Sequence, residues 1–298
     1  MTWLVLLMVV ALGVANQRGS TCAVSAADEV ITSRSGHRLA GFLVAAMVSA
    51  GVLFALGSAP RQTAVVGLGS VLGGAIGAIG ASLNGRCAMG TIASLGRGRL
   101  DRLVTLVGFY CGARLVLHGL EWHAPLAELT PHASPVYAVA CLIVAVTAWW
   151  LARDHSPASP AWMALIGLLN AVLLWLMADW SYTGGLTRLA AGGSFDMVQF
   201  WLYLGALVLG SAAAAALAGT LQLRSSSRRE WSLSGLGGLL LGAGSAIVPG
   251  SNDAMLLIGV PLLVPGLLLA YLSFWVVLIG LRGLRYRNMT REPANALA

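Results

Sequence analysis

Two widely separated apolar stretches carry small residues at every fourth position and then end at a polar break. The first runs through Gly69, Gly73, Gly77, Ala81 and Gly85 into Arg86-Cys87, and the second through Ser234, Gly238, Gly242, Ala246 and Gly250 into Ser251-Asn252-Asp253. Small residues at this spacing let helices approach closely in lipid. A break inside a membrane leaves backbone groups that only a protein-lined or wet cavity tolerates. Matching breaks in two halves of a chain therefore predict a transport site between repeats.

The composition places the chain among α-helical integral membrane proteins. Hydrophobic residues make up 58% and charged residues 10% of the 298 residues, and the mean hydropathy is +0.81. Soluble domains carry about 25% charged residues. We therefore expect one membrane domain over residues 1–298, surrounded by the lipid bilayer and without a sizeable soluble part. The net charge of +7 could suggest nucleic acid, but single arginines between apolar runs point to membrane topology instead, so no nucleic-acid partner is expected.

The apolar runs predict about nine transmembrane spans. They lie near 2–16, 39–57, 64–96 (interrupted), 103–118, 135–152, 161–178, 195–217, 232–260 (interrupted) and 262–281. The predicted first half covers about 1–134, a connector span covers about 135–152, and the second half covers about 161–281. The fold expected from this order is all-α, with re-entrant half-helices at the two breaks.

Arginine, which supplies every basic residue, sets the predicted orientation. Loops on one side hold Arg18, Arg34, Arg38, Arg97, Arg99, Arg102, Arg153, Arg224, Arg228, Arg229, Arg282, Arg285, Arg287 and Arg291, and loops on the other side hold Arg61 and Arg188. By the positive-inside rule the rich side is cytoplasmic, so the N-terminus is outside and the C-terminus inside a bacterial inner membrane. The two ladders then run in opposite directions, as in an inverted repeat. The alternative is that glycine ladders arise by chance in a chain with 37 glycines.

Two polar breaks pair a cysteine with a nearby arginine. Arg86 precedes Cys87 at the end of the first ladder, and Arg18 precedes Cys22 after the first span. An ionisable residue inside a bilayer is a functional candidate, and a thiol is a weak donor with a polarisable sulfur. These features favour a sulfur-containing anion. The alternatives are a snorkelling Arg86 and a small buried thiol in an ordinary loop at Cys22.

The other cysteines and the remaining motifs indicate no further site. Cys111 and Cys141 lie in unbroken apolar helices and are predicted to be small core residues. No cysteine pair has zinc spacing, so no metal site is expected. No nucleotide-binding or heme motif is visible, so no cofactor is expected either.

At these residues the chain resembles the YeeE/YedE family of sulfur-compound permeases. The shared pattern is the segment Gln17, Arg18 and Cys22, and the ladder ending at Gly85, Arg86 and Cys87. The resemblance implies a nine-span, hourglass-like inverted repeat that takes up thiosulfate. It also implies a relay in which cysteines pass thiosulfate along by S–H to sulfur hydrogen bonds.

The chain departs from the family pattern at two positions. Asn252, flanked by Ser251 and Asp253, stands where the repeat alignment with Cys87 would put a cysteine, and Arg86 stands where the family has a glycine. A relay through three cysteines is therefore not expected to operate unchanged.

Three functions remain open at this stage. A sulfur-anion permease would bind substrate near Cys87, Ser251 and Asn252, assisted by Arg86, and release it past Cys22 and Arg18. A non-transporting subunit would anchor or feed a small cytoplasmic sulfurtransferase of the TusA-like type. A membrane enzyme would use Cys22 as nucleophile and needs a nearby base, for which His37 is the closest histidine in sequence. The sequence favours the permease, because both halves carry a polar break, and an enzyme is not expected.

Overall fold

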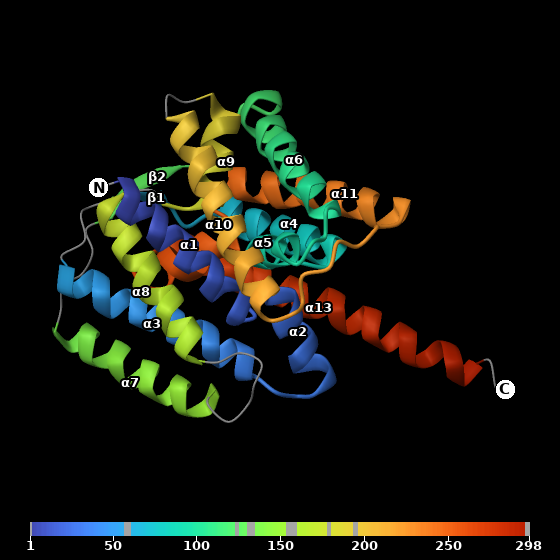
Figure 1. Ribbon diagram of the computed structural model, residues 1–298, viewed down its shortest axis with the longest axis horizontal. Coiled ribbons are helices and arrows are strands. Elements are labelled where there is room, and N and C mark those ends of the chain that lie inside the picture. The colour runs from blue at the N-terminus through green and yellow to red at the C-terminus, as the bar shows by residue number, and fades with distance from the viewer. Residues whose placement is uncertain are drawn as a thin grey trace.

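The computed structural model describes residues 2–56, 61–122, 125–129, 135–152, 160–177, 180–192 and 196–295, and nearly all of its regular elements are helices (Figure 1). The first part contains α1 (Thr2–Arg18), α2 (Ala23–Thr32), α3 (His37–Leu56), β1 (Arg61–Ala64), α4 (Leu68–Asn84), α5 (Ala88–Gly96), α6 (Asp101–Arg114), the π-helix η1 (Leu115–Gly119) and β2 (Leu126–Leu129). The second contains α7 (Pro135–Ala152), α8 (Pro160–Leu176), α9 (Tyr182–Ala191), α10 (Met197–Leu217), α11 (Arg228–Ile247), α12 (Asn252–Ala254), the π-helix η2 (Met255–Gly259) and α13 (Pro265–Asn295). Arg153 of the predicted inner loops lies outside the described residues.

Helices of the same kind follow one another in the same order on either side of α7. A long helix, a short helix, two long helices, a short helix and a long helix make up α1 to α6, and α8 to α13 follow the same order when α12 and η2 are taken as one short helix. Glycine creates both predicted breaks. Gly85 ends α4 at φ 68°, and Gly250 precedes α12 at φ 101°, a backbone region that other residues rarely adopt.

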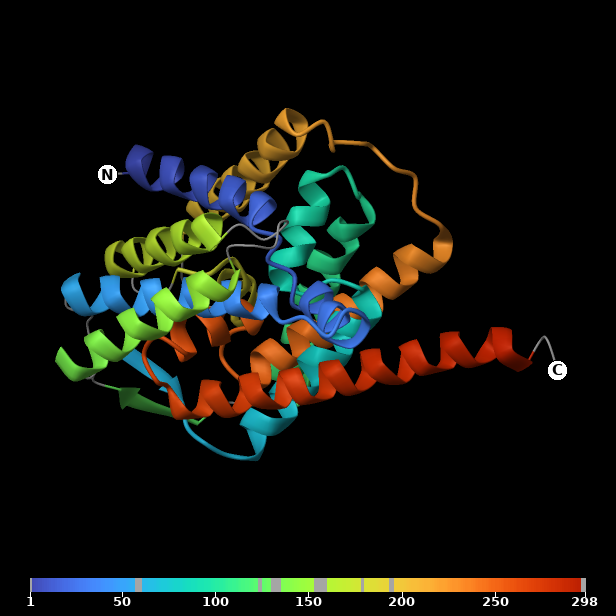
Figure 2. The ribbon, with the colours of Figure 1, turned by 90° about the horizontal axis from the view of Figure 1, so that it is seen from below.

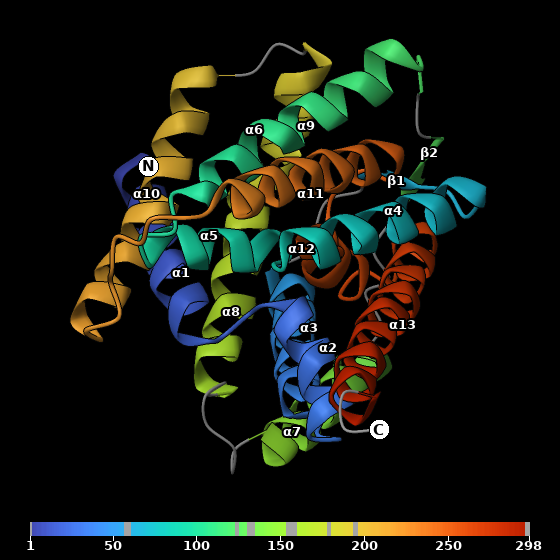
Figure 3. The ribbon, with the colours of Figure 1, turned by 90° about the vertical axis from the view of Figure 1, so that its right-hand side faces the viewer.

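The packing partners follow the same correspondence. α1 packs on α10 while α3 packs on α8, and α11 packs on α6 while α4 packs on α13. The short helices behave likewise, because α2 packs on α13 and α9 packs on α6. Across the centre, α4 lies alongside α11 (Figure 3).

Glycine backbones form the contact between α4 and α11. A Cβ added at Gly80 would lie 2.7 Å from the Gly237 carbonyl oxygen, and one added at Gly244 would lie 2.6 Å from that of Gly73. The second ladder itself faces α6, where a Cβ at Gly242 would lie 1.9 Å from the Phe109 carbonyl oxygen. The two ladders therefore do not face each other, because α11 turns the row with Gly237 and Gly244 toward α4 and its ladder toward α6.

The helices confirm a multi-pass α-helical membrane protein. By length and composition, five described helical segments can cross a membrane: Trp3–Thr32, His37–Leu56, Leu68–Gly96, Met197–Leu217 and Pro265–Asn288. A sixth forms if Arg228–Ile247 and Asn252–Gly259, bent by 52°, are counted as one span. The described part of α7 and the helix α8 are shorter apolar helices. Nine spans therefore stay a prediction.

Two features depart from a purely helical bundle. β1 and β2 pair antiparallel, with Arg61 opposite Leu129, and form a small two-stranded sheet. α13 runs past the body of the bundle, so its C-terminal end projects alone (Figures 1 and 2). Arg282, in the middle of α13, binds Asp28 of α2 through two hydrogen bonds of 2.6 and 2.7 Å, which attach the helix to the bundle before its projecting part.

Candidate functional site

The starts of four short helices converge inside the bundle. Their N-cap residues are Cys22 before α2, Cys87 before α5, Ser181 before α9 and Ser251 before α12, and all four have extended backbone. Three hydrogen bonds join these starts: Ala23 N to Cys87 Sγ (3.2 Å), Ala88 N to Asn252 Oδ1 (3.2 Å) and Ser181 Oγ to Asp253 Oδ2 (3.0 Å). Helix N-termini carry partial positive charge and unpaired amides, so their meeting point favours an anion.

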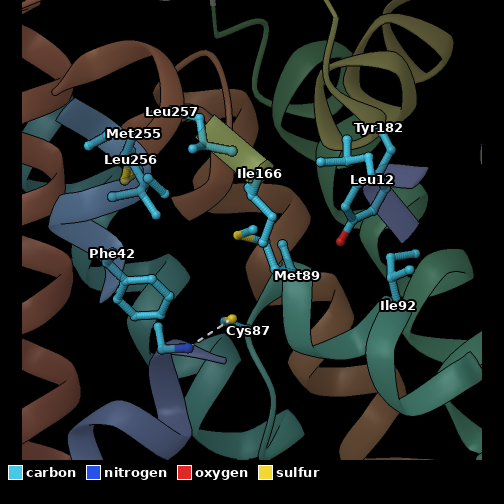
Figure 4. Packing of buried hydrophobic residues seen from close by; sticks show 14 of the residues in the cluster. Leu12, Phe42, Cys87, Met89, Ile92, Ile166, Tyr182, Met255, Leu256 and Leu257 are labelled. Carbon is cyan, nitrogen blue, oxygen red and sulfur yellow. Dashed lines mark hydrogen bonds between the residues drawn. The ribbon is translucent and has the colours of Figure 1, made fainter. Parts of the chain in front are cut away.

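Two free thiols lie at the meeting point of α2 and α5. The Cys87 sulfur is fully buried, accepts from the amide of Ala23 and lies 3.8 Å from the Thr21 carbonyl oxygen (Figure 4). Cys22 is also buried, and its side chain is close enough to Cys87 for a hydrogen bond between the thiols. A Cβ at Gly90 would lie 2.6 Å from the Cys22 sulfur, so glycine is what lets this thiol pack against α5.

Asn84 holds the first break in shape. Its Nδ2 donates to the Arg86 carbonyl oxygen at 2.8 Å and to Thr91 Oγ1 at 3.0 Å. Its Oδ1 accepts from Thr105 Oγ1 at 2.9 Å, and Arg102 also donates to it. Asn84 thus connects α4, α5 and α6 at the turn before Cys87. Asn84 was not predicted as a site residue from the sequence, although an asparagine directly before a helix-ending glycine could have indicated it.

A basic vestibule opens beside the break. It has a volume of about 470 Å³, and its lining includes Arg86, Arg97, Arg99, Arg102, Arg224 and Arg285, with Glu230 as the one acidic side chain among the described residues. Arg86 also donates to Ser25 Oγ at 2.9 Å, which ties the vestibule to α2. Anions would concentrate in such a space. From the sequence, most of these arginines predict only the orientation of the chain in the membrane, because their grouping depends on how distant loops meet.

An ion-pair network around Asp101 forms the vestibule wall. Its carboxylate lies 2.9 Å from Arg99 Nε and 3.2 Å from Arg102 Nε, and it accepts from Ser226 and Ser234. Burial raises the pKa of Asp101, but these hydrogen bonds and charges outweigh it and bring the pKa to about 2. The carboxylate is therefore charged throughout the neutral range and links α6 to α11.

A second, smaller cavity lies beside the helix starts. Its volume is about 50 Å³, and Leu12, Met89, Ile92, Tyr182 and Leu257 supply much of its apolar lining. Asn16 and Asn170 line it as well. Each donates through Nδ2 to a carbonyl oxygen near a helix start, Met89 at 3.1 Å and Leu257 at 3.2 Å. Asp253 lines the cavity too, and of the lining residues that the structure describes it is the one carboxylate.

The structure brings together most of the residues that the sequence singled out. Cys22, Cys87, Ser251 and Asn252 are buried at the converging helix starts, and Arg86 reaches the vestibule beside them. Arg18 does not join them, because it lies exposed at the C-terminal end of α1 and lines neither cavity.

The repeat alignment needs a refinement and the prediction for Cys111 needs correction. The counterpart of Cys87 depends on the reference point: counted from the positive-φ glycines Gly85 and Gly250 it is Asn252, as predicted, whereas Ser251 shares with Cys87 the N-cap position of a short helix. Cys111 is exposed on α6 instead of lying in the core, because the opposite face of that helix packs on α11, whereas Cys141 is buried as predicted.

Comparison with known proteins identifies a family likeness over part of the chain. Residues 18–156 match a family model described as sulphur transport. The match confirms the resemblance to the YeeE/YedE family over that part of the chain, which contains Cys22, Arg86 and Cys87. No curated protein matches the chain.

Proposed function

We propose that this chain is an inner-membrane permease for a small sulfur-containing anion, with thiosulfate as the preferred substrate. The observation that carries the proposal is the convergence of four helix starts around the thiols of Cys22 and Cys87. Residues next to Cys87 line both cavities, Met89 the smaller one and Arg86 the basic vestibule, and the point joins residues from both halves of the chain.

The chemistry of this path suits a sulfur anion. Helix N-termini and the vestibule arginines attract negative charge without a fixed full charge at the centre. A thiol donates weakly and its sulfur is polarisable, so Cys87 and Cys22 can hold a terminal sulfur without trapping it. Ser251, which shares the N-cap position with Cys87, supplies a hydroxyl in place of a third thiol. The substrate would pass between the two thiols and leave through the vestibule.

The same proposal includes an inverted repeat with nine crossings. The common order of helices and the exchanged packing partners, α1 on α10 beside α3 on α8, support two copies related by a twofold axis in the membrane plane. The arginine-rich vestibule would face the cytoplasm, with the N-terminus outside and the C-terminus inside. α7 would be the connector that reverses the second copy.

The vestibule also supports a partner on the cytoplasmic side. A small sulfurtransferase of the TusA-like type would receive the anion there, and this chain itself would act as transporter rather than enzyme. The alternative remains a non-transporting subunit that anchors or feeds such a partner. In that case the purified chain would move no anion across a bilayer.

Uptake by the purified protein tests the proposal. Proteoliposomes that contain only this chain should take up labelled thiosulfate, with sulfite and sulfate as competitors. A sulfur-auxotrophic host that expresses the chain should grow on thiosulfate as sole sulfur source. Growth without uptake by proteoliposomes would favour the subunit alternative. The absence of both growth and uptake would reject the permease.

A further inference from the structure

Asp253 is a buried carboxylate that the pathway described so far does not use. Asp253 is 7% exposed, and it lines the smaller cavity. Thr183 Oγ1 lies 2.8 and 2.9 Å from its two oxygens, and Ser181 Oγ lies 3.0 Å from Oδ2. Within the described residues, the ion pairs with arginine involve Asp28, Glu29, Asp101 and Glu230, and none involves Asp253.

A carboxylate at this position conflicts with an anion pathway. Among the described residues that line the cavity there is no arginine or histidine, so a substrate anion there would face the negative charge of Asp253 directly. Burying an unpaired charge is costly in itself, and a second negative charge beside it adds repulsion. A bound proton removes both costs.

We propose that Asp253 is a proton-binding site that couples anion uptake to proton entry, an inference that rests on the proposed permease. A proton from the outer side binds the carboxylate and gives a neutral acid. The anion then occupies the cavity and passes to the vestibule, and the proton leaves to the cytoplasm. One proton moves inward each time Asp253 is protonated and deprotonated, and no bond in the substrate is made or broken.

The two hydroxyls suit a group that alternates between charged and neutral forms. Ser and Thr hydroxyls donate to a carboxylate, and they rotate to accept from a carboxylic acid. Ser181 and Thr183 can therefore satisfy Asp253 in either state. The proton is favoured over a metal ion, because among the described residues no group of three His, Cys, Asp or Glu side chains lies together that could hold one.

The titratable neighbours of Asp253 are few. Of the helices packed on α12, α9 brings Tyr182 next to it and α5 begins at Cys87, while η2 carries no titratable residue. Arg188 lies near the opposite end of α9. Tyrosine and cysteine ordinarily titrate above about pH 8, so a dependence of uptake on more acidic pH is assigned to the carboxyl group.

Proteoliposomes with a clamped membrane potential test the inference. Labelled thiosulfate uptake should rise when the outside is acidified and should accumulate beyond equilibrium under an imposed pH gradient. A pH dye should report proton entry with the anion. In Asp253→Asn, a permanently neutral mimic, the pH gradient should no longer drive accumulation, while counterflow of thiosulfate continues at a changed rate. Asp196→Asn is the matched control, because asparagine also caps α10 and residue 196 does not line the cavity; it should behave as the parent.

A second variant covers the case in which Asp253→Asn does not fold. Ser181→Ala with Thr183→Val removes the donors that favour the charged form, so half-maximal uptake should move to higher pH by roughly one unit. Uptake by the parent that ignores the pH gradient, accumulation retained in Asp253→Asn, or an unshifted profile in the double variant would overturn the inference. Dependence on a sodium gradient would overturn it as well. If the parent shows counterflow in any of these cases, the proposed permease function still stands. If the parent shows no counterflow, the permease function itself is rejected.

Discussion

The backbone amide of Ala88 donates a 3.2 Å hydrogen bond to Oδ1 of Asn252, a residue 164 positions further along the chain. Both residues are buried, and each belongs to the start of a short helix. The bond therefore joins the two polar breaks directly. It also gives Asn252 a role that a cysteine would not fill well, since a thiol is a weak acceptor.

This bond predicts different outcomes for cysteine at neighbouring positions. Asn252→Cys should leave the Ala88 amide poorly paired, at a cost of about 1–3 kcal/mol, and should lower uptake. Ser251→Cys keeps that bond and places a third thiol at the N-cap position that Ser251 shares with Cys87, so it should retain thiosulfate uptake. Thermal unfolding in detergent and initial uptake rates measure both effects. Equal behaviour of the two variants would contradict the correspondence of Ser251 with Cys87.

Cys87 should matter for uptake through its donor capacity. Cys87→Ala removes the thiol that faces the pathway and should weaken binding roughly ten- to hundredfold, while Cys87→Ser keeps a donor and should retain part of the uptake. Cys111→Ala is the control, because this exposed residue lies on α6 away from the helix starts. Competition by unlabelled thiosulfate gives the affinities. If Cys22→Ala and Cys87→Ala both transport like the parent, the thiols serve packing alone.

Close helix contacts should make two glycines intolerant of even one methyl group. A Cβ at Gly242 or at Gly80 would press on backbone atoms of α6 or α11, so Gly242→Ala and Gly80→Ala should each cost about 1–3 kcal/mol of stability. Gly205→Ala is the matched control, because no atom lies within 4 Å of the added carbon. Unfolding midpoints in detergent provide the measurement, and a loss in Gly205→Ala as large as in the others would refute the contact argument.

The Asp101 network should stabilise the protein equally across the neutral range. The folded-state pKa of about 2 lies below the ordinary value of about 3.9, so the stabilisation is complete above the ordinary value and is lost as pH falls through about 2. Asp101→Asn should therefore cost about 2 kcal/mol, by the same amount at pH 5 and pH 8. Asp28→Asn, which breaks a more exposed pair with Arg282, should cost less than about 1 kcal/mol. A cost for Asp101→Asn that disappears at pH 5 would be inconsistent with this pKa.

Reporter fusions should locate the vestibule on the cytoplasmic side. Arg99 and Arg224 lie next to each other in an isolated β-bridge, so fusions after either residue should give the same, cytoplasmic, signal. A fusion after Gly192, which ends α9, should report from outside. A cytoplasmic signal at Gly192 would exclude the inverted arrangement of the two halves.

The sequence by itself determined the class of protein and the places where its helices break. Hydropathy and helix length are local properties, so the apolar runs predicted most of the long helices within a few residues. Gly85 and Gly250 marked the breaks because glycine adopts positive φ without strain. The short helices α2 and α9 were not resolved as separate elements, because ten residues that include polar and charged side chains give no apolar run long enough to be recognised by hydropathy.

The tertiary structure decided which of these local features meet. The rotation of each helix about its axis leaves Arg18 exposed, gives the glycines of α11 two different partners, and selects Ser251 as the residue that starts α12. The vestibule arginines and the contact of Asp253 with Thr183 likewise join segments far apart in sequence. Such pairings depend on the packing of the whole bundle, where a side chain's partners are fixed by many simultaneous contacts and by no local pattern.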